Sequence, residues 1–192
     1  AYLPKDLFQL HDAAQAPEGQ AQLSQREQRT IRRDESVVWA GNVEGHAIEV
    51  LQPKTVEAVM EIGGGPGVTL EGRPTRSTGW CTTQEEHASR YFSQGPIYIF
   101  KQDGRNLAQL HPQSGQFMDV EDVAVPTLDG DGQSYITNPE LSAGLIGAGL
   151  DGESGFHAFH KDTAPPVVLA HVFGQEGDDL DDDVAAKIES DP

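Results

Sequence analysis

Three residues have types and an order that could support nucleophilic catalysis: Cys81, His111 and Asp119. Cys81 comes just before a predicted helix start at Thr83, and the amide N–H groups at a helix N-terminus favour a thiolate. His111 and then Asp119 follow on two successive predicted strands. In a cysteine-dependent hydrolase or transferase, Cys81 would be the nucleophile, His111 the base and Asp119 the group that orients the imidazole, while Gln109 could polarise a carbonyl.

This order resembles the layout of papain-like and transglutaminase-like thiol enzymes, in which a cysteine at a helix start is followed by a histidine on one strand and an aspartate on the next. Two alternatives stay open. The pair Trp80-Cys81 can be a buried apolar pair, because a lone cysteine often acts as a small core residue. Gln109 and His111 share one face of their strand, and if that face meets solvent, His111 is a surface residue.

A second enzymatic hypothesis uses the same segment. The middle motif of ADP-ribosyltransferases, enzymes that use NAD, is similar to this segment. The likeness consists of the run Thr78–Thr83, the helix that follows it and then the Gly95–Phe100 strand. That resemblance implies that Glu121 orients the ribose. His46 is the best available residue for the first motif of that family, whose usual early arginine or histidine has no convincing counterpart.

Two groups of residues have side chains that could bind a metal ion, but neither group predicts a metal or another cofactor. His157 and His160 are three residues apart with Asp162 nearby, and His171 follows, but interleaved phenylalanines favour ordinary packing. The run 129–132 begins like a calcium loop but lacks the third acidic position and the distal glutamate, so it predicts a turn.

The segments around the candidate residues predict a helix followed by a three-stranded meander. Thr83 and Glu86 have capping-box spacing, which places a helix from Thr83 to about Ser93. The β-branched and aromatic run 97–100 predicts a buried strand, Asp103-Gly104 a hairpin turn, and 107–111 and 116–120 the next two strands.

The flanking segments are less regular. Residues 36–52 predict a hairpin and 55–62 a short helix, which the glycine-rich run 63–67 ends. After Pro126 the chain is expected to be irregular: Leu141–Leu150 is a loop or weak helix, and 167–173 is a last strand.

Length and composition favour one α+β domain. The chain has 192 residues, with 21 Gly and 12 Pro, which argues against a long helical bundle. We expect a small, mostly antiparallel sheet with one or two short helices. The predicted organisation is a peripheral segment over 1–35, a globular domain over 36–173 and an acidic tail over 174–192.

Charge restricts the partners. The formal net charge of −18 would repel nucleic-acid phosphates, so direct DNA or RNA binding is not expected. The one basic cluster is predicted to be an exposed helix face, or alternatively a dock for the acidic tail; it consists of Arg26, Arg29, Arg32 and Arg33. The single cysteine excludes an intramolecular disulfide, and no apolar run reaches the length that spans a bilayer. We therefore expect a cytoplasmic protein that is either free or incorporated into a virion.

Several short motifs over residues 36–125 resemble a loose family of bacteriophage and bacterial proteins with a Thr-x-Trp-Cys-Thr signature. They are the run 50–58, Thr78–Thr83, Tyr91, Gly95–Ile99, Gln109–His111 and 116–122. Residues 66–76 form an insertion relative to that pattern, and the family has no established activity. The resemblance implies a phage or mobile-element origin, and the leading expectation is a non-catalytic, virion-associated or host-directed protein that binds a protein partner.

Overall fold

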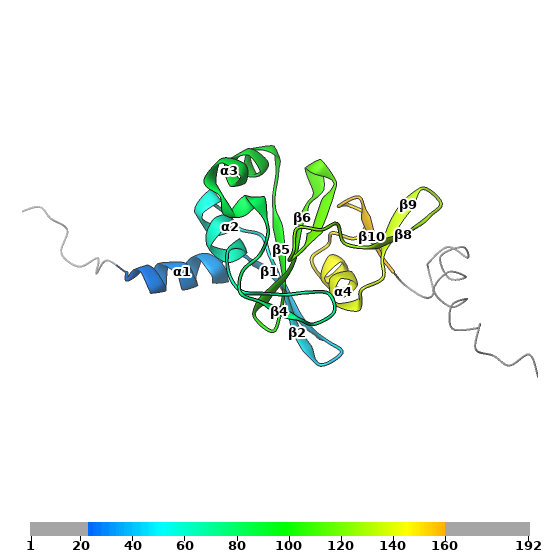
Figure 1. The fold of residues 1–192 in the computed structure, drawn as a ribbon, viewed down its shortest axis with the longest axis horizontal. Helices are drawn as coiled ribbons and strands as arrows, with labels where there is room; N and C mark the ends of the chain where they lie inside the picture. Colours follow the sequence, from blue (N-terminus) through cyan, green and yellow to red (C-terminus); the bar gives the residue numbers. More distant parts are fainter. Residues whose placement is uncertain (1–22, 160–192) are drawn as a thin grey trace, which may run out of the picture.

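The computed structural model describes residues 23–159, which form two sheets and four α-helices (Figure 1). The larger sheet has the strand order β1-β2-β5-β6-β3-β4, with β7 also paired to β6. Its strands are β1 (Val37–Val43), β2 (His46–Leu51), β3 (Gly67–Val68), β4 (Pro74–Thr75), β5 (Tyr98–Gln102), β6 (Arg105–His111) and β7 (Gln116–Asp119). The smaller sheet contains β8 (Thr127–Gly130), β9 (Gln133–Ile136) and β10 (Phe156–Ala158).

Most pairs of neighbouring strands are antiparallel, and only β3–β6 and β9–β10 are parallel among the described residues. The helices are α1 (Gln25–Asp34), α2 (Val56–Gly63), α3 (Glu85–Gln94) and α4 (Pro139–Gly147). The predicted α+β class with a mostly antiparallel sheet is thus confirmed, although four helices are present where one or two were expected.

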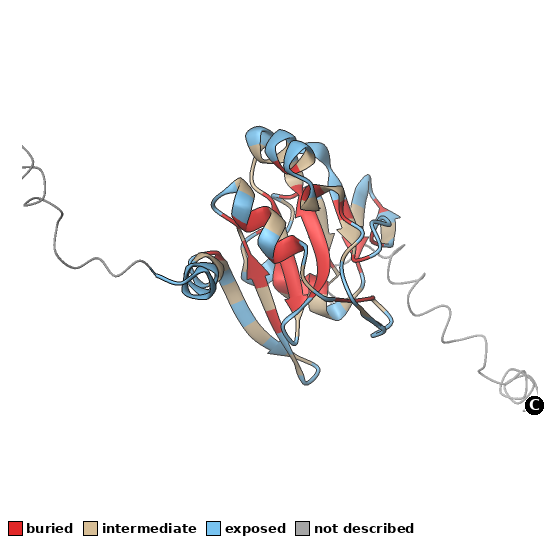
Figure 2. Ribbon diagram, turned by 60° about the vertical axis from the view of Figure 1, so that its left-hand side comes forward, coloured by how far each residue is buried: buried red, intermediate tan, exposed pale blue. Residues whose placement is uncertain are grey.

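Alternation along the central strands gives the larger sheet two apolar faces. Leu51 and Ile99 point to one face, where they pack with α2, α3 and Trp80. Val50 and Phe100 point to the other face, where α4 and residues of the smaller sheet cover them. Figure 2 shows the burial concentrated in the central strands, whereas α1 is exposed.

The meander predicted over 97–120 is confirmed as β5, β6 and β7. The turn between β5 and β6 is built by Asp103 and Gly104, both with positive φ, as the Asp-Gly pair predicts. The hairpin β1–β2 and helix α2 also lie where the sequence places them.

After Pro126 the described residues are more regular than expected, with three short strands, and Leu141–Leu150 takes the helical one of its two predicted alternatives. Leu141–Leu150 contains most of α4, whose first turn is capped by the Asn138 side chain. Gly144 lets this helix lie close to the sheet, since a Cβ there would come within 2.7 Å of the Phe100 ring. Close packing therefore stabilises a helix that two glycines, Gly144 and Gly147, make unfavourable by propensity. The predicted strand over 167–173 and the acidic tail lie outside the described residues.

Within residues 23–159, no helix combines the length and the apolar character needed to cross a membrane.

Candidate functional site

The residues that carry the Thr-x-Trp-Cys-Thr resemblance gather where the turn before α3 lies over β6 and β7. Trp80 is 2% exposed, and its Nε1 donates to the main-chain oxygen of Asp119 at 2.5 Å. The Gly79 N–H donates to the Val120 oxygen at 2.8 Å. These bonds hold the turn Trp80–Thr83, whose last three residues form the short 3₁₀ helix η2 (Cys81–Thr83), against β7.

Thr82 points from this turn into the protein. Its hydroxyl donates to Gln109 Oε1 at 2.6 Å, and both side chains are buried. Gln109 lies opposite Met118 on β7 and Ile99 on β5. A buried polar pair of this kind is stable because each group satisfies the other. The inner residue of the turn is thus a threonine, while Cys81 beside it is half-buried.

His111 is buried at the end of β6, so the surface alternative for this residue was wrong. Its ring is 2% exposed and meets the Tyr91 ring edge-on at 5.2 Å between centroids. Its Nδ1 lies 2.8 Å from the Ser114 hydroxyl, and its Nε2 has no hydrogen-bond partner among the described residues. Burial lowers the pKa of His111, which favours a neutral imidazole.

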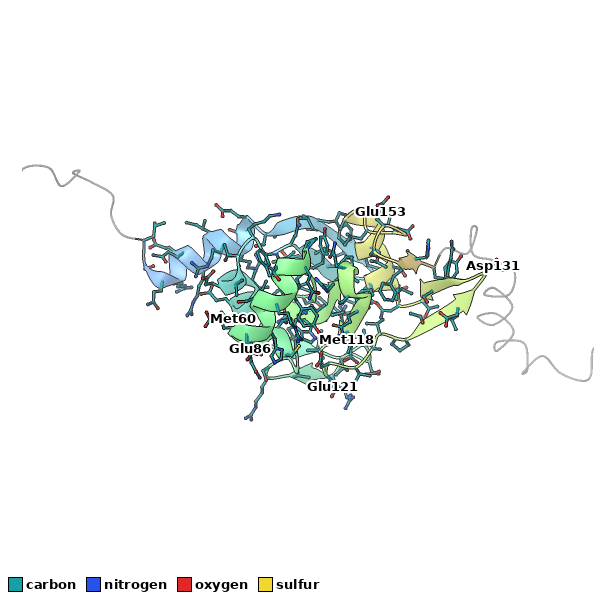
Figure 3. All side chains as sticks on the ribbon, turned by 90° about the horizontal axis from the view of Figure 1, so that it is seen from above. Met60, Glu86, Met118, Glu121, Asp131 and Glu153 are labelled. Atoms are coloured by element: carbon teal, nitrogen blue, oxygen red, sulfur yellow. The ribbon has the colours of Figure 1, made fainter. Side chains whose placement is uncertain are left out.

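Asp119 ends β7, and its carboxylate shapes the turn that follows. Oδ1 accepts from the N–H groups of Glu121 at 2.9 Å and Val123 at 3.0 Å. In the β6–β7 register, Asp119 lies opposite Ala108, whereas His111 lies opposite Gln116. Three residues of ladder, about 10 Å, therefore separate the two positions. In residues 23–159 no hydrogen bond joins the Cys81 thiol, the His111 ring and the Asp119 carboxylate. Figure 3 views this region from the α3 side, with Met118 and Glu121 marking β7 and its turn.

The surroundings of the Cys81 thiol favour its protonated form, whereas the sequence predicted a thiolate. Burial, and then the Asp122 carboxylate, raise the pKa of the thiol, and Arg90 opposes this only in part. The predicted capping box is also absent: α3 begins at Glu85 with Gln84 as N-cap, and the Thr83 hydroxyl donates back to the Trp80 oxygen at 2.8 Å. The amide end of α3 therefore begins beyond the turn that carries the thiol.

The residues assigned by the ADP-ribosyltransferase hypothesis are also engaged separately. His46 lies at the start of β2, where its Nδ1 is 2.7 Å from Asp103 in the β5–β6 turn. Glu121 follows β7, and its carboxylate lies 3.9 Å from Arg73. The run Thr78–Thr83, which carries the resemblance to the middle motif, ends in the short 3₁₀ helix η2.

The described residues contain no cluster of three or more His, Cys, Asp or Glu side chains that could hold a metal ion. His157 lies on β10, with Nδ1 3.9 Å from Asp151. Its predicted companions His160, Asp162 and His171 lie outside the described residues.

Two chemically notable residues escaped the sequence analysis. Asn106 is fully buried on β6, and its Nδ2 donates to the carbonyls of Ile62 at 2.8 Å and Gly63 at 3.0 Å, which close the C-terminal end of α2. Lys101 is only 8% exposed on β5. Its position next to a hairpin turn predicts that the lysine is exposed. The one feature of the sequence that indicates burial is the apolar run that precedes it.

Comparison of this chain with known protein families, curated proteins and solved structures gave no match.

Proposed function

We propose that this protein is a non-catalytic interaction protein of phage or mobile-element type, virion-associated or host-directed, which binds a protein partner through α1. The phage origin is supported by the motif resemblance, and a cytoplasmic location, free or within a virion, goes with it. The observation that carries the binding function is the orientation of α1, which turns its apolar side chains to solvent.

Helix α1 is attached to the domain through its charged side. Arg32 donates to both oxygens of Glu61 on α2, at 2.7 to 3.0 Å, and Arg29 Nε lies 3.5 Å from the same carboxylate. Arg33 pairs with Glu49 on β2 at 2.5 Å. None of the residues of α1 is buried. A surface helix normally turns its apolar side to the core, so this attachment is inverted.

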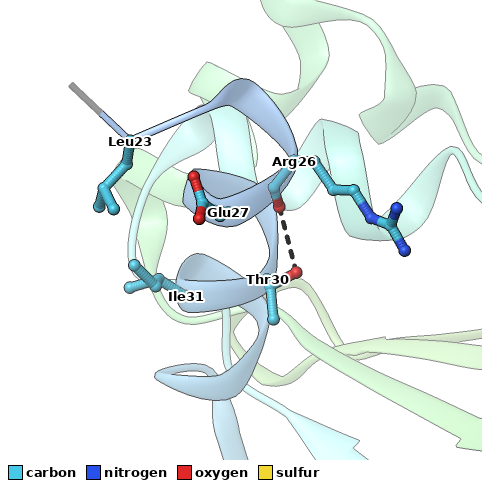
Figure 4. Close-up of a pocket in the computed structure, with 5 residues that line it drawn as sticks. All are labelled: Leu23, Arg26, Glu27, Thr30 and Ile31. Carbon is cyan, nitrogen blue, oxygen red and sulfur yellow. Dashed lines mark hydrogen bonds between the residues drawn. The ribbon is translucent and has the colours of Figure 1, made fainter. Parts of the chain in front are cut away.

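The outward side of α1 carries a shallow groove with an apolar centre and a polar rim. Leu23 and Ile31 are 48% and 40% exposed. Figure 4 shows both side chains on one side of the helix, with Arg26 directed away from them. Together with Glu27 and Thr30, these residues line a cavity of about 350 Å³. An apolar centre within a polar rim is the anatomy of a protein interface, and an amphipathic helix of a partner fits it.

Residues 23–159 contain no assembled nucleophile, which supports the non-catalytic part of the proposal. The thiol has a raised pKa, the imidazole is buried against Ser114 and Tyr91, and the Asp119 carboxylate accepts from its own turn. These contacts are those of a structural cluster that fastens the turn before α3 to the sheet.

The test is quantitative co-purification of the full chain from its native host, comparing wild type with Ile31→Glu. A charge at the groove centre is expected to lower recovery of the partner at least about tenfold, or about 1.4 kcal/mol. Val123→Glu is the matched control, because Val123 is 58% exposed on the turn after β7.

Equal recovery with Ile31→Glu and wild type would overturn the proposal. So would light scattering that shows Ile31→Glu only dissociating a homodimer, because the groove would then bind a second copy of this chain.

A further inference from the structure

A second cavity lies between α1, α2 and β5, on the domain side of α1. It has a volume of about 170 Å³ and is lined by Arg29, Arg33, Glu61, Ile62, Gly65 and Lys101. It differs from the outward groove in being mostly charged, with three of its six lining residues cationic.

Lys101 reaches this cavity from the buried face of the sheet. The residue is 8% exposed, and its ammonium takes part in none of the hydrogen bonds or ion pairs among the described residues, although that atom itself is not sealed from solvent. Burial of the side chain first, and then Arg33, lower the pKa of Lys101, with Glu49 opposing them.

The carboxylates around the cavity are already engaged by arginines. Glu61 accepts a bidentate pair from Arg32, Glu49 pairs with Arg33, and Asp34 contacts Arg33 at 3.2 Å. Of the three cations that line the cavity, Arg33 has two carboxylate partners, Arg29 has one at 3.5 Å, and Lys101 has none among the described residues. Lys101 and Arg29, whose side chain is 65% exposed, are therefore the cations with room for an added anion.

The carbonyl end of α2 also borders the cavity and would repel an anion. Asn106 removes much of that obstacle, because its amide donates to the Ile62 and Gly63 carbonyls. Both carbonyls therefore have a hydrogen-bond donor.

We propose that this cavity binds an oxoanion, a carboxylate or phosphate group, held between the Lys101 ammonium and the Arg29 guanidinium, with Arg33 adding positive charge beside it. Charge-assisted hydrogen bonds from one forked guanidinium and one ammonium match the oxygens of such a group. Binding also supplies the Lys101 ammonium with the partner it lacks. The inference is independent of what binds the outward groove.

The test is an NMR titration of the full chain with inorganic phosphate and, separately, with acetate, each against sodium chloride at matched ionic strength. Saturable shifts of the Arg29, Gly65 and Lys101 amides are expected with at least one probe. Stronger saturation by phosphate assigns a phosphate-bearing ligand, and stronger saturation by acetate assigns a carboxylate.

Lys101→Met is expected to weaken this binding at least about tenfold. Arg26→Gln, on the same helix but outside the cavity, is expected to leave it unchanged. If Lys101→Met loses its dispersed spectrum, Arg29→Gln replaces it, because that side chain is largely exposed. Shifts that never saturate, or that persist equally in the folded cavity variant, would overturn the proposal.

Discussion

At the scale of single residues, the thiol of Cys81 gives the sharpest distinction between a catalytic and a structural cluster. Its pKa is raised by burial and by the Asp122 carboxylate. Because the thiolate is the reactive species, alkylation is expected to be slow at neutral pH and to rise only above the ordinary thiol range.

Asp122→Asn should move the inflection of the alkylation rate to lower pH, because it removes a negative charge near the thiolate. Arg90→Gln should move it the other way. The measurement is the iodoacetamide rate against pH, followed by mass spectrometry. An inflection below the ordinary thiol pKa in the wild type would restore Cys81 as a candidate nucleophile.

His111 makes stability depend on pH with a defined sign. Burial places its native pKa below the ordinary 6.5. On acidification the unfolded chain therefore binds this proton first, so the contribution to stability is complete above about 6.5 and is lost as pH falls through the native pKa. His111→Gln is expected to flatten the fall in urea midpoint between about pH 7 and about pH 5.

His46→Gln is the control with the opposite sign. Its hydrogen bond to Asp103 raises the pKa of His46, so the native state gains stability on protonation and loses that gain as pH rises. Replacing His46 should therefore make the loss of stability with falling pH steeper. A His111 variant with an unchanged pH profile would show that this ring is not held neutral by the core.

At the scale of elements, α4 is a helix stabilised by close approach to the sheet. A Cβ at Gly144 would lie 2.7 Å from the Phe100 ring and 3.0 Å from Val50. Gly144→Ala should therefore destabilise the protein by about 1–3 kcal/mol, although alanine is the better helix former. Ile146→Ala, on the exposed side, should have little effect in the same urea unfolding experiment. A stabilised Gly144 variant would contradict this packing.

Helix α1 is predicted to be held by ion pairs, since none of its residues is buried. Glu61→Gln removes the carboxylate that Arg29 and Arg32 share, and exposed pairs contribute at most about 1 kcal/mol each. Amide exchange over residues 25–34 should accelerate several-fold, and added salt should reproduce the effect in the wild type. Glu86→Gln on α3 is the control. Unchanged exchange would mean that other contacts hold the helix.

At the scale of the whole molecule, one apolar cluster joins the two sheets. Leu145 on α4 packs with Phe100 of the larger sheet and with Ile136 and Ala158 of the smaller one. Leu145→Ala is expected to cost about 3 kcal/mol and to speed amide exchange in both sheets together. Independent exchange of the smaller sheet would show that it forms a separate cooperative unit.

The sequence predicted local structure better than it predicted long-range contacts. Alternation and the Asp103-Gly104 turn defined the central meander, because both signals act between neighbours in the chain. The glycines of α4 misled, because Gly144 lies against the ring of Phe100 and Gly147 against the ring of Trp39, and both rings are distant in the sequence. The candidate site shows the same limit: the order of Cys81, His111 and Asp119 is plain, but hydrogen-bond partners and strand register decide whether such residues cooperate.

The strand order has a consequence for synthesis on the ribosome. β2 emerges early and pairs with β1, but its other edge stays open until β5 is made, about fifty residues later. β3 leaves the ribosome before β6, the strand with which it pairs. One edge of β6 pairs with β3 over part of its length and with β7 over another part. In the nascent chain, β3 and β4 therefore stay unpaired with the rest of the sheet until β6 is made. Translation beyond residue 111, the end of β6, is the step that allows them to join the sheet.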